Sequence, residues 1–544
     1  MSNHDTLSLK WTRLYPAGIG ENLTVEEKHL LHAFDKNVQK NPEAAFLHYF
    51  ETTVSYARLA ADSDALAVCF KDRGVGAGDR VAIIMQTVPA FAIATIAAWR
   101  LGAIPVPINP MYRAAELGRI FADAEPAIVV CQDIDQTEVD AALASIGRNL
   151  NLLVAHPATG ADDCADVPPR TDTMPERDFD EAIARYAGCR PPPWQPDPAT
   201  TALILYTSGT TGQPKGAMLS HGALMHNASF IKQWCRLHED ECMLAIAPLF
   251  HITGFVCHLG AALVSGTALV MSYRFEPGLA LRMIRRWRPA FTIGVITAFN
   301  ALMRVPSIAP EDMASLRAVF SGGAPIPLAL QKEIEAALGV RIAPCYGMTE
   351  TAAPATFTPT GVAAPSIDGS LSVGLPIPGT ELLIAGDDGQ ALPVFQHGEV
   401  LLRGPQIMQG YWRKPEETAA ALHDGWLHTG DVGFMDEHGW LYLVDRMKDV
   451  IIASGFKVWP REVEDALYAF AGIREAAVVG IADTYRGESV KAFVSLANGA
   501  TLNTPDLLAH CRTLLAAYKV PREIEVLAEL PKTVTGKIQR SALR

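Results

Sequence analysis

Short runs of aliphatic and β-branched residues alternate along the chain with longer stretches of mixed polarity. The apolar runs predict buried strands at 81–85, 127–131, 202–206, 477–481 and 491–496. The stretches EEKHLLHAFDKNVQK (26–40) and LALQKEIEAALG (328–339) predict helices. Strands and helices that alternate in this way favour α/β layers with largely parallel sheets.

The length of the chain and two segments of unusual composition predict its domain organisation. A chain of 544 residues exceeds the usual size of one hydrophobic core, so two or three domains are expected. The segment CRPPPWQPDPAT (189–200) carries five prolines and is interpreted as a linker between subdomains. A charged turn near 444–452 predicts a second boundary, after which roughly a hundred residues form a small domain.

Two apolar windows, 81–99 and 255–273, approach the length of a membrane span. Both are interrupted by polar side chains and by proline or glycine, so buried core elements are predicted there and no transmembrane segment. The N-terminal residues lack the basic start and apolar run of a signal peptide, which favours a cytoplasmic location. Loose peripheral association with a membrane stays open.

Composition and charge argue against several classes of function. A hydrophobic fraction of 49% and a charged fraction of 19% are typical of a well-buried globular protein. The formal charge of −13 argues against a nucleic-acid partner, because such proteins usually carry a basic face. Nine cysteines without a CxxC pair indicate reduced thiols in a cytoplasmic protein, and neither a disulfide framework nor a zinc site.

The segment YTSGTTGQPKGA (206–217) concentrates glycines, hydroxyl groups and one cation. It lies between a predicted strand and a helix-like stretch, and its spacing does not match the Walker pattern. A glycine-rich loop after a strand can fold its N–H groups around an anion, and a lysine adds a point charge for a polyphosphate. A flexible surface turn is the alternative. The candidate phosphate-binding residues are Thr207, Ser208, Gly209, Thr210, Thr211, Gly212 and Lys215.

Taken with six further segments, this loop resembles the corresponding motif of the AMP-forming adenylating enzymes. That family includes acyl- and aryl-CoA synthetases, luciferases and peptide-synthetase adenylation domains. The further segments appear in the family's order and span most of the chain. They are PLFHITG (248–254), SGGAPIP (321–327), YGMTE (346–350), WLHTGD (426–431), DRMKDVIIASGFKVWPREVE (445–464) and PKTVTGKIQR (531–540).

The resemblance implies both a fold and a reaction. The expected fold is α/β, with a large N-terminal domain of stacked α/β subdomains (1–444), a hinge (445–448) and a small mobile C-terminal α+β domain (449–544). The expected reaction joins a carboxylic acid to the AMP of ATP, releases pyrophosphate, and then transfers the acyl group to CoA. ATP, Mg²⁺ and CoA are the implied cofactors. Cations and hydrogen-bond donors are needed because the carboxylate must approach the negatively charged α-phosphate.

The same resemblance assigns the nucleotide site. Glu350 is the expected magnesium ligand, with Thr207 sharing the ion, and Thr349 would contact the α-phosphate; hard oxygen ligands suit Mg²⁺. A solvated glutamate at a helix start is the alternative for Glu350. Tyr346 would stack on the adenine, although a buried core tyrosine competes with that assignment. The remaining residues expected near the base and phosphates are Gly322, Gly323, Ala324, Gly347 and Met348.

Two further residues are expected on the ribose and one on the acyl carboxylate. Asp431 would accept hydrogen bonds from both ribose hydroxyls, and Arg446 would add a contact to the same sugar. Taken alone, TGD is equally typical of a turn or a helix cap. His251 would lie beside the acyl carboxylate, whereas a lone histidine in an apolar run is more often a core residue.

The C-terminal segment supplies the remaining catalytic residues that the resemblance implies. Lys537 would bridge the carboxylate and the α-phosphate during adenylation, and a solvated surface lysine is the alternative. Lys448 is the hinge position. After rotation of the small domain, the loop 454–460 would meet the CoA pantetheine, and Gly455 would keep the thiol tunnel open. The expected catalytic set is therefore Lys537, His251, Lys215 and Glu350.

The acid substrate is predicted from the apolar segments near the histidine motif. Neither PLFHITGFVCHLGAAL (248–263) nor TIGVITAFNALM (292–303) carries the acidic residue that would hold an amino acid's ammonium group. A medium- or long-chain fatty acid is favoured, and a 4-coumarate- or benzoate-like aryl acid is the alternative. Phe255 either shapes the channel mouth or belongs to the core.

The acceptor and the assembly are less constrained by the sequence. CoA is the favoured acceptor, with a separate acyl carrier protein as the alternative. A non-catalytic nucleotide- or acyl-binding protein is a weaker alternative, because Lys215, Glu350, Asp431 and Lys537 are all present. The oligomeric state stays open, a homodimer among the options.

Overall fold

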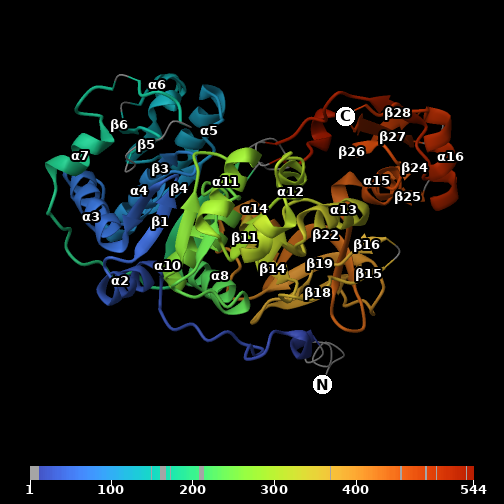
Figure 1. Ribbon diagram of the computed structural model, residues 1–544, viewed down its shortest axis with the longest axis horizontal. Helices are drawn as coiled ribbons and strands as arrows, with labels where there is room; N and C mark the ends of the chain where they lie inside the picture. Colours follow the sequence, from blue (N-terminus) through green and yellow to red (C-terminus); the bar gives the residue numbers. More distant parts are fainter. Residues whose placement is uncertain are drawn as a thin grey trace.

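The computed structural model describes residues 11–544 except Asn149, 160–166, Asp172, 208–213, Asp368, 454–455, 484–486, Asn498 and 534–535. The chain forms a large N-terminal body, which ends with strand β23 (Leu441–Arg446), and a smaller C-terminal domain, which begins with β24 (Ile451–Ala453). In Figure 1 the C-terminal domain, coloured red, lies at one end of the molecule. Helix α15 (Pro460–Tyr468) of this domain contacts α13 (Leu328–Leu338) of the N-terminal body.

The centre of the N-terminal body is a nine-stranded sheet. Its strand order is β17-β14-β13-β12-β11-β9-β10-β1-β2, and the strands from β13 to β1 run parallel. Because all five strands from β13 to β10 are largely buried, they read in the sequence as short apolar runs. The strands are β1 (Ala45–Tyr49), β2 (Thr52–Ser55), β9 (Cys242–Leu244), β10 (Ala268–Met271), β11 (Phe291–Gly294), β12 (Ala318–Ser321), β13 (Ala343–Met348), β14 (Ala353–Phe357) and β17 (Leu375–Pro376).

A second, fully parallel sheet has the order β4-β3-β5-β6, and a third, antiparallel sheet has the order β20-β8-β7. Helix α4 (Pro89–Arg100) packs on β3 and β4, and α6 (Gln136–Ser145) packs on β5. The strands are β3 (Arg80–Ile84), β4 (Ile104–Ile108), β5 (Ile128–Gln132), β6 (Asn151–Ala155), β7 (Thr201–Thr207), β8 (Lys215–Ser220) and β20 (Gly410–Tyr411).

The other helices of the N-terminal body surround these sheets (Figure 1). Helix α2 begins only at Leu30, because the His29 side chain caps it by accepting the N–H of His32 at 3.0 Å. The bounds are α2 (Leu30–Lys40), α3 (Tyr56–Asp72), α5 (Ala114–Ala124), α7 (Phe179–Arg185), α8 (His221–Trp234), α10 (Ala261–Ser265), α11 (Pro277–Trp287), α12 (Ile296–Met303) and α14 (Pro415–Ala421).

Besides a two-stranded antiparallel sheet of β15 (Ser366–Ile367) and β16 (Ser370–Leu371), two larger and mainly antiparallel sheets complete the described chain. The first, at the C-terminal end of the N-terminal body, joins β18 (Glu381–Ala385), β19 (Gly398–Arg403), β22 (Trp426–Met435), β21 (Leu422–His423) and β23. The second, in the C-terminal domain, joins β25 (Phe456–Val458), β24, β27 (Gly487–Leu496) and β26 (Ile473–Asp483), with β28 (Glu523–Val526) parallel to β27. Helices α15 and α16 (Thr504–Leu514) lie in this domain.

The predicted strands and helices are present, with two corrections. The sheets are not largely parallel throughout, because those around β8, β19 and β27 are antiparallel or nearly so. The predicted loop at 207–217 is shorter than expected, since Lys215–Ser220 is strand β8, paired with β7. Its side chains alternate only weakly in polarity, so the sequence pattern did not indicate a strand.

The two apolar windows are core elements, as predicted. Residues 81–99 form most of β3 and α4, whereas 255–273 form a π-helical turn (Phe255–Gly260), α10 and β10. Nearly every side chain in both windows is buried. In the described part of the chain, no helix combines the length and the apolarity that crossing a bilayer requires.

Candidate active site

The antiparallel pair β7 and β8 carries two candidate phosphate-binding residues, Thr207 and Lys215, at one end. Thr207 and Lys215 are opposite each other in the last register position of the pair, and the Thr207 hydroxyl lies 3.4 Å from the Lys215 carbonyl oxygen. Gly216 leaves no room for a side chain, because a Cβ there would lie 2.8 Å from Ile204. The predicted loop residues between these strands lie outside the described residues: Ser208, Gly209, Thr210, Thr211 and Gly212.

The segment YGMTE forms the end of β13 and a 3₁₀ turn (Thr349–Thr351). Gly347 is required there, since a Cβ would lie 1.7 Å from the carbonyl oxygen of Ala353. The turn continues through Ala352 and Ala353, which adopt left-handed φ angles of 49° and 84°. Met348 and Thr349 are half-buried and buried respectively, beside Glu350. The close backbone packing therefore fixes the direction in which the Glu350 side chain leaves the turn.

Asn227 of α8 stabilises this strained turn and was not predicted from the sequence. Its side-chain N–H₂ group lies 2.9–3.0 Å from three carbonyl oxygens, those of Thr351, Ala352 and Pro354. Because Asn227 is fully buried, its amide group makes its hydrogen bonds to these backbone carbonyls and not to water. Helix α8 thereby holds the segment that carries Glu350.

Glu350 is a buried carboxylate, with only 8% of the residue exposed. Its Oε1 accepts a hydrogen bond from the Tyr411 hydroxyl at 2.8 Å, and its carbonyl oxygen accepts the N–H of Met408 at 2.8 Å. Among the described residues, no lysine, arginine or histidine lies within ion-pair distance of the Glu350 carboxylate. A buried carboxylate without such a partner is typical of a cation site.

The residues expected at the ribose are joined to the residue expected at the adenine. The Tyr346 hydroxyl donates to Asp431 Oδ2 at 2.6 Å, and Arg446 Nε lies 3.1 Å from Asp431 Oδ1. Burial and the Asp431 charge raise the pKa of Tyr346 well above its ordinary value, so it remains a donor. Tyr346 is thus buried, and its hydroxyl is hydrogen-bonded to Asp431. Asp431 and Arg446 face each other across the pair β22 and β23.

The segment SGGAPIP begins at the end of β12, where its glycines allow close packing. A Cβ on Gly322 would lie 2.7 Å from the Cys345 sulfur, and Gly323 has a φ of +77°, which favours glycine. Ala324 follows directly, in a segment without regular structure. The backbone at Gly322 therefore packs closely against Cys345, the residue before Tyr346.

His251 and Lys537 lie within electrostatic range of each other. Burial and the Lys537 charge lower the pKa of His251 to about 4, so its ring is neutral at neutral pH. His251 also caps the turn Ile252–Gly254 by accepting the N–H of Thr253 at 3.3 Å. Desolvation and Arg446 lower the pKa of Lys537 to about 8, whereas Asp431 acts in the opposite direction.

The loop that carries Lys537 is inserted against the N-terminal body. A Cβ built on Gly536 would lie 2.7 Å from the Thr297 hydroxyl and 3.8 Å from the Thr297 Cβ. Gly536 has a φ of +80°, and the Lys537 N–H donates to the Thr533 hydroxyl at 3.1 Å. The C-terminal domain therefore delivers Lys537 to the same place as His251, Asp431 and Arg446.

Arg540, three residues after Lys537, holds this loop and was not predicted. It forms two hydrogen bonds with Glu464 of α15, at 2.9 and 2.6 Å, and one with Asp445 of β23 at 2.8 Å. Of the other C-terminal predictions, Gly455 lies outside the described residues. Lys448 belongs to a 3₁₀ turn (Met447–Asp449) at the start of the C-terminal domain.

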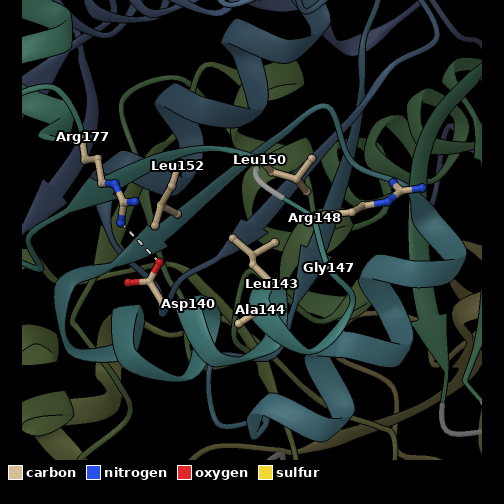
Figure 2. A pocket seen from close by; sticks show the side chains of 8 residues that line it. All are labelled: Asp140, Leu143, Ala144, Gly147, Arg148, Leu150, Leu152 and Arg177. Atoms are coloured by element: carbon tan, nitrogen blue, oxygen red, sulfur yellow. Dashed lines mark hydrogen bonds and ion pairs between the residues drawn. The ribbon is translucent and has the colours of Figure 1, made fainter.

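Phe255 belongs to the core. It is fully buried, and its ring centroid lies 6.3 Å from that of Phe91 and 5.9 Å from that of Trp99. A separate surface cavity of about 350 Å³ lies beside α6 and β6, where Asp140 and Arg177 form an ion pair (Figure 2). None of the predicted site residues lines that cavity.

Comparisons with known proteins decide the family. The family model described as AMP-binding enzyme matches residues 34–412, and that of the AMP-binding enzyme C-terminal domain matches 462–537. The chain belongs to the AMP-binding enzyme family. The α/β fold with a large N-terminal and a smaller C-terminal domain is thereby confirmed, as is the resemblance found in the sequence.

Three relatives of this AMP-binding enzyme illustrate the range of the family. The long-chain-fatty-acid–CoA ligase of Bacillus subtilis is 33% identical over 98% of this chain and 97% of its own length. A feruloyl-CoA synthase from an Amycolatopsis species is 35% identical over 94% of this chain and 97% of its own length. ATP-bound MatB from Rhodopseudomonas palustris aligns with a TM-score of 0.84 and 29% identity, over 94% of this chain and 98% of that one.

This AMP-binding enzyme is an acid–thiol ligase. It activates a carboxylic acid as an acyl-adenylate with ATP and transfers the acyl group to CoA. The alternative of a non-catalytic binding protein is therefore set aside. The relatives act on acids of different kinds, so their names alone leave the acid open.

Proposed function

We propose that the acid is a medium- or long-chain fatty acid. The observation that supports this is the apolar segment β11–α12, which adjoins the catalytic lysine loop. Val295 and Thr297 of this segment approach Gly536, and the neighbouring Phe291, Ile293, Ile296, Phe299 and Leu302 are buried. The segment contains no acidic residue, so it has no carboxylate that would pair with the ammonium group of an amino acid substrate. The Bacillus relative is named for long-chain fatty acids.

An aryl acid is the second candidate. The feruloyl-CoA synthase has 35% identity to this chain, slightly above the 33% of the fatty acid ligase. A flat aromatic acid could bind the same apolar segment, because desolvation of either acid is favoured by burial against aliphatic side chains. The two candidates differ in the depth of pocket that they need.

In the proposed first step, Lys537 bridges the acyl carboxylate and the α-phosphate as they approach. Its ammonium offsets the repulsion between these two anions, where charge concentrates in the transition state. His251 stays neutral and lies beside the carboxylate, so it acts through hydrogen bonding without adding charge. Lys215 and Thr349 contact the phosphates, Asp431 and Arg446 hold the ribose, and Tyr346 lies against the adenine.

The residues around Glu350 fit a magnesium ion. Glu350 is a buried carboxylate without an ion-pair partner among the described residues, and Thr207, at the end of β7 opposite Lys215, would add a hydroxyl oxygen. Mg²⁺ usually takes few protein ligands and completes its shell with phosphates and water. Consistently, the described residues contain no cluster of three histidine, cysteine or acidic side chains that could hold a metal alone. When bound, the ion would neutralise charge on the triphosphate.

In the proposed second step, the C-terminal domain (449–544) rotates about a hinge at 445–448, which includes Lys448. Rotation would withdraw Lys537 and present the loop around Gly455 to CoA. The described side-chain hydrogen bonds across this boundary support such a motion, because two arginines of the C-terminal domain make them. Arg461 donates to the Leu443 carbonyl oxygen at 3.0 Å, and Arg540 to Asp445 at 2.8 Å.

Pyrophosphate release tests the substrate proposal. Acids from acetate to hexadecanoate, with benzoate, coumarate and ferulate, would be supplied with ATP and Mg²⁺, each with and without CoA. The proposal expects the highest kcat/KM for a medium- or long-chain fatty acid, with steady turnover only when CoA is present. A preference for ferulate or coumarate by tenfold or more would replace the fatty acid with the aryl candidate. Turnover with an acyl carrier protein and none with CoA would overturn CoA as the acceptor.

A further inference from the structure

Tyr411 lies between the two charged residues of the phosphate site. It ends strand β20, which pairs antiparallel with β8 at Gly410–Met218 and Tyr411–Ala217. The N–H of Trp412 also donates to the Gly216 carbonyl oxygen at 2.7 Å. These backbone hydrogen bonds place the Tyr411 side chain two residues from Lys215 along the facing strand.

The hydroxyl of Tyr411 faces Glu350. It donates to Glu350 Oε1 at 2.8 Å, whereas the N–H of Met408, three residues earlier, donates to the Glu350 carbonyl oxygen at 2.8 Å. One short segment therefore holds Glu350 by both its backbone and its side chain. The hydrogen bond to Oε1 leaves Oε2 as the acceptor without a described protein donor, since no other side-chain hydrogen bond to this carboxylate occurs among the described residues.

The ring of Tyr411 faces Lys215. The Lys215 Nζ lies 5.2 Å from the ring centroid, within the range of a cation–π interaction. The hydroxyl and the ring of Tyr411 therefore contact different charged residues, Glu350 and Lys215.

We propose that Tyr411 is a positioning residue that couples the metal carboxylate to the phosphate-binding lysine. Its hydroxyl fixes the Glu350 carboxylate and leaves one oxygen for the divalent cation. Its ring restrains the Lys215 ammonium on the side of the triphosphate. This inference rests on the proposed role of Glu350 as a metal ligand. It assigns Tyr411 no contact with the substrate or the reacting atoms.

Binding of Mn²⁺ tests the hydroxyl without turnover. The free Mn²⁺ signal in electron paramagnetic resonance would be titrated with the full-length protein and α,β-methylene-ATP. Tyr411→Phe removes only the hydroxyl, and we expect about tenfold weaker Mn²⁺ binding, the usual effect of losing a group that orients a metal ligand. Tyr442→Phe is the matched control, since the Tyr442 hydroxyl also donates to a buried carboxylate, that of Asp436 at 3.2 Å. It should leave Mn²⁺ binding unchanged.

Binding of the same ATP analogue in EDTA tests the ring. Tyr411→Phe keeps the ring and should bind the analogue as the unmodified protein does. Tyr411→Leu removes the ring and should bind it roughly two- to fivefold more weakly, the size of a cation–π interaction. Equal affinity of the phenylalanine and leucine variants in EDTA would overturn the role of the ring.

Glu350→Gln separates failure of the inference from failure of the proposed metal site. If Glu350→Gln weakens Mn²⁺ binding and Tyr411→Phe does not, Tyr411 is only structural and the inference is wrong. If neither substitution changes Mn²⁺ binding, Glu350 is not a metal ligand, and both proposals fail. A thermal unfolding midpoint within a few degrees of the unmodified protein is required of each variant, and Tyr411→Phe retains the apolar volume that should ensure it.

Discussion

The N-terminal body and the C-terminal domain are held together internally in the same way, but they are joined to each other differently. Each has its own hydrophobic clusters. The larger cluster of the N-terminal body extends to Val444, and that of the C-terminal domain begins at Ile451. Across the boundary, the described side-chain hydrogen bonds are made by Arg461 and Arg540 to β23.

This difference fits the proposed motion of the C-terminal domain. An apolar interface gains its free energy by excluding water, so opening it exposes the whole buried area at once. Separate charged hydrogen bonds can instead be exchanged for hydrogen bonds to water without exposing a large apolar area. The described contacts suit a C-terminal domain that docks to deliver Lys537 and later leaves.

The largest effect is expected for Lys537→Ala, because it removes the cation that the docked domain delivers. Acid-dependent pyrophosphate release should fall about 10²–10³-fold, the usual loss for one group that stabilises transition-state charge. Transfer of a supplied acyl-adenylate to CoA should be nearly unchanged. Equal loss in both half-reactions would contradict a role confined to the first.

Phe255→Ala tests the packing inside the N-terminal body. Phe255 is fully buried against Phe91 and Trp99, so its removal should lower the free energy of unfolding by about 3–5 kcal/mol. Denaturant unfolding followed by tryptophan fluorescence measures this. The order of preference among acids of different chain length should stay the same. A changed chain-length preference without loss of stability would place Phe255 in the acyl channel instead.

Arg540→Ala tests the polar boundary. Its loss leaves Asp445 and Glu464 without a charged hydrogen-bond partner, and such bonds contribute about 1.5–3 kcal/mol, so pyrophosphate release should fall roughly 10–100-fold. Asp445→Asn weakens only the contact across the boundary and should show a smaller loss in the same half-reaction. Arg544→Ala is the control, since Arg544 pairs only with Asp449 among the described residues. Thioester formation from supplied acyl-adenylate that fell as much would contradict this account.

The smallest effect is the pH dependence of the first half-reaction. The pKa of Lys537 is lowered to about 8. The proposed mechanism uses the ammonium form, so kcat/KM should fall as pH rises through 8. At one pH unit above the pKa, the loss should reach about tenfold. Lys537→Arg should remove this alkaline limb, because the guanidinium stays charged. An identical limb in the arginine variant would assign the titration to another group.

The sequence predicted well those features that depend on local pattern or motif. The strands around 81–85 and 202–206 and the core position of both apolar windows follow from runs of buried side chains. The family follows from seven motifs in order. Strand β8 was not predicted, because it contains Gly216 and its side chains alternate only weakly in polarity.

The sequence did not predict residues that act through distant partners. Tyr411 meets Glu350 across 61 positions of the chain, Asn227 meets Thr351 across 124, and Arg540 meets Glu464 across 76. Each is an ordinary residue in its local segment, and only the fold brings its partner close. The roles assigned to Ser208 and Gly455 stay predictions, because both lie outside the described residues.

A reversible disulfide that holds the C-terminal domain in its docked position tests the central claim most directly. The claim is that this domain moves between the two half-reactions. The Cβ positions of Gly536 and Thr297 lie 3.8 Å apart, which suits a disulfide between cysteines placed at both. A side chain at Gly536 must adopt a φ of +80°, at a cost of about 1–2 kcal/mol, so each single cysteine variant serves as a control.

The oxidised Gly536→Cys/Thr297→Cys protein should retain acid-dependent exchange of pyrophosphate with ATP at the rate of its reduced form. It should make acyl-CoA at least a hundredfold more slowly, and reduction should restore the rate. Acyl-CoA formation at an undiminished rate in the oxidised protein would contradict the account, since the acyl group would then reach CoA without withdrawal of Lys537.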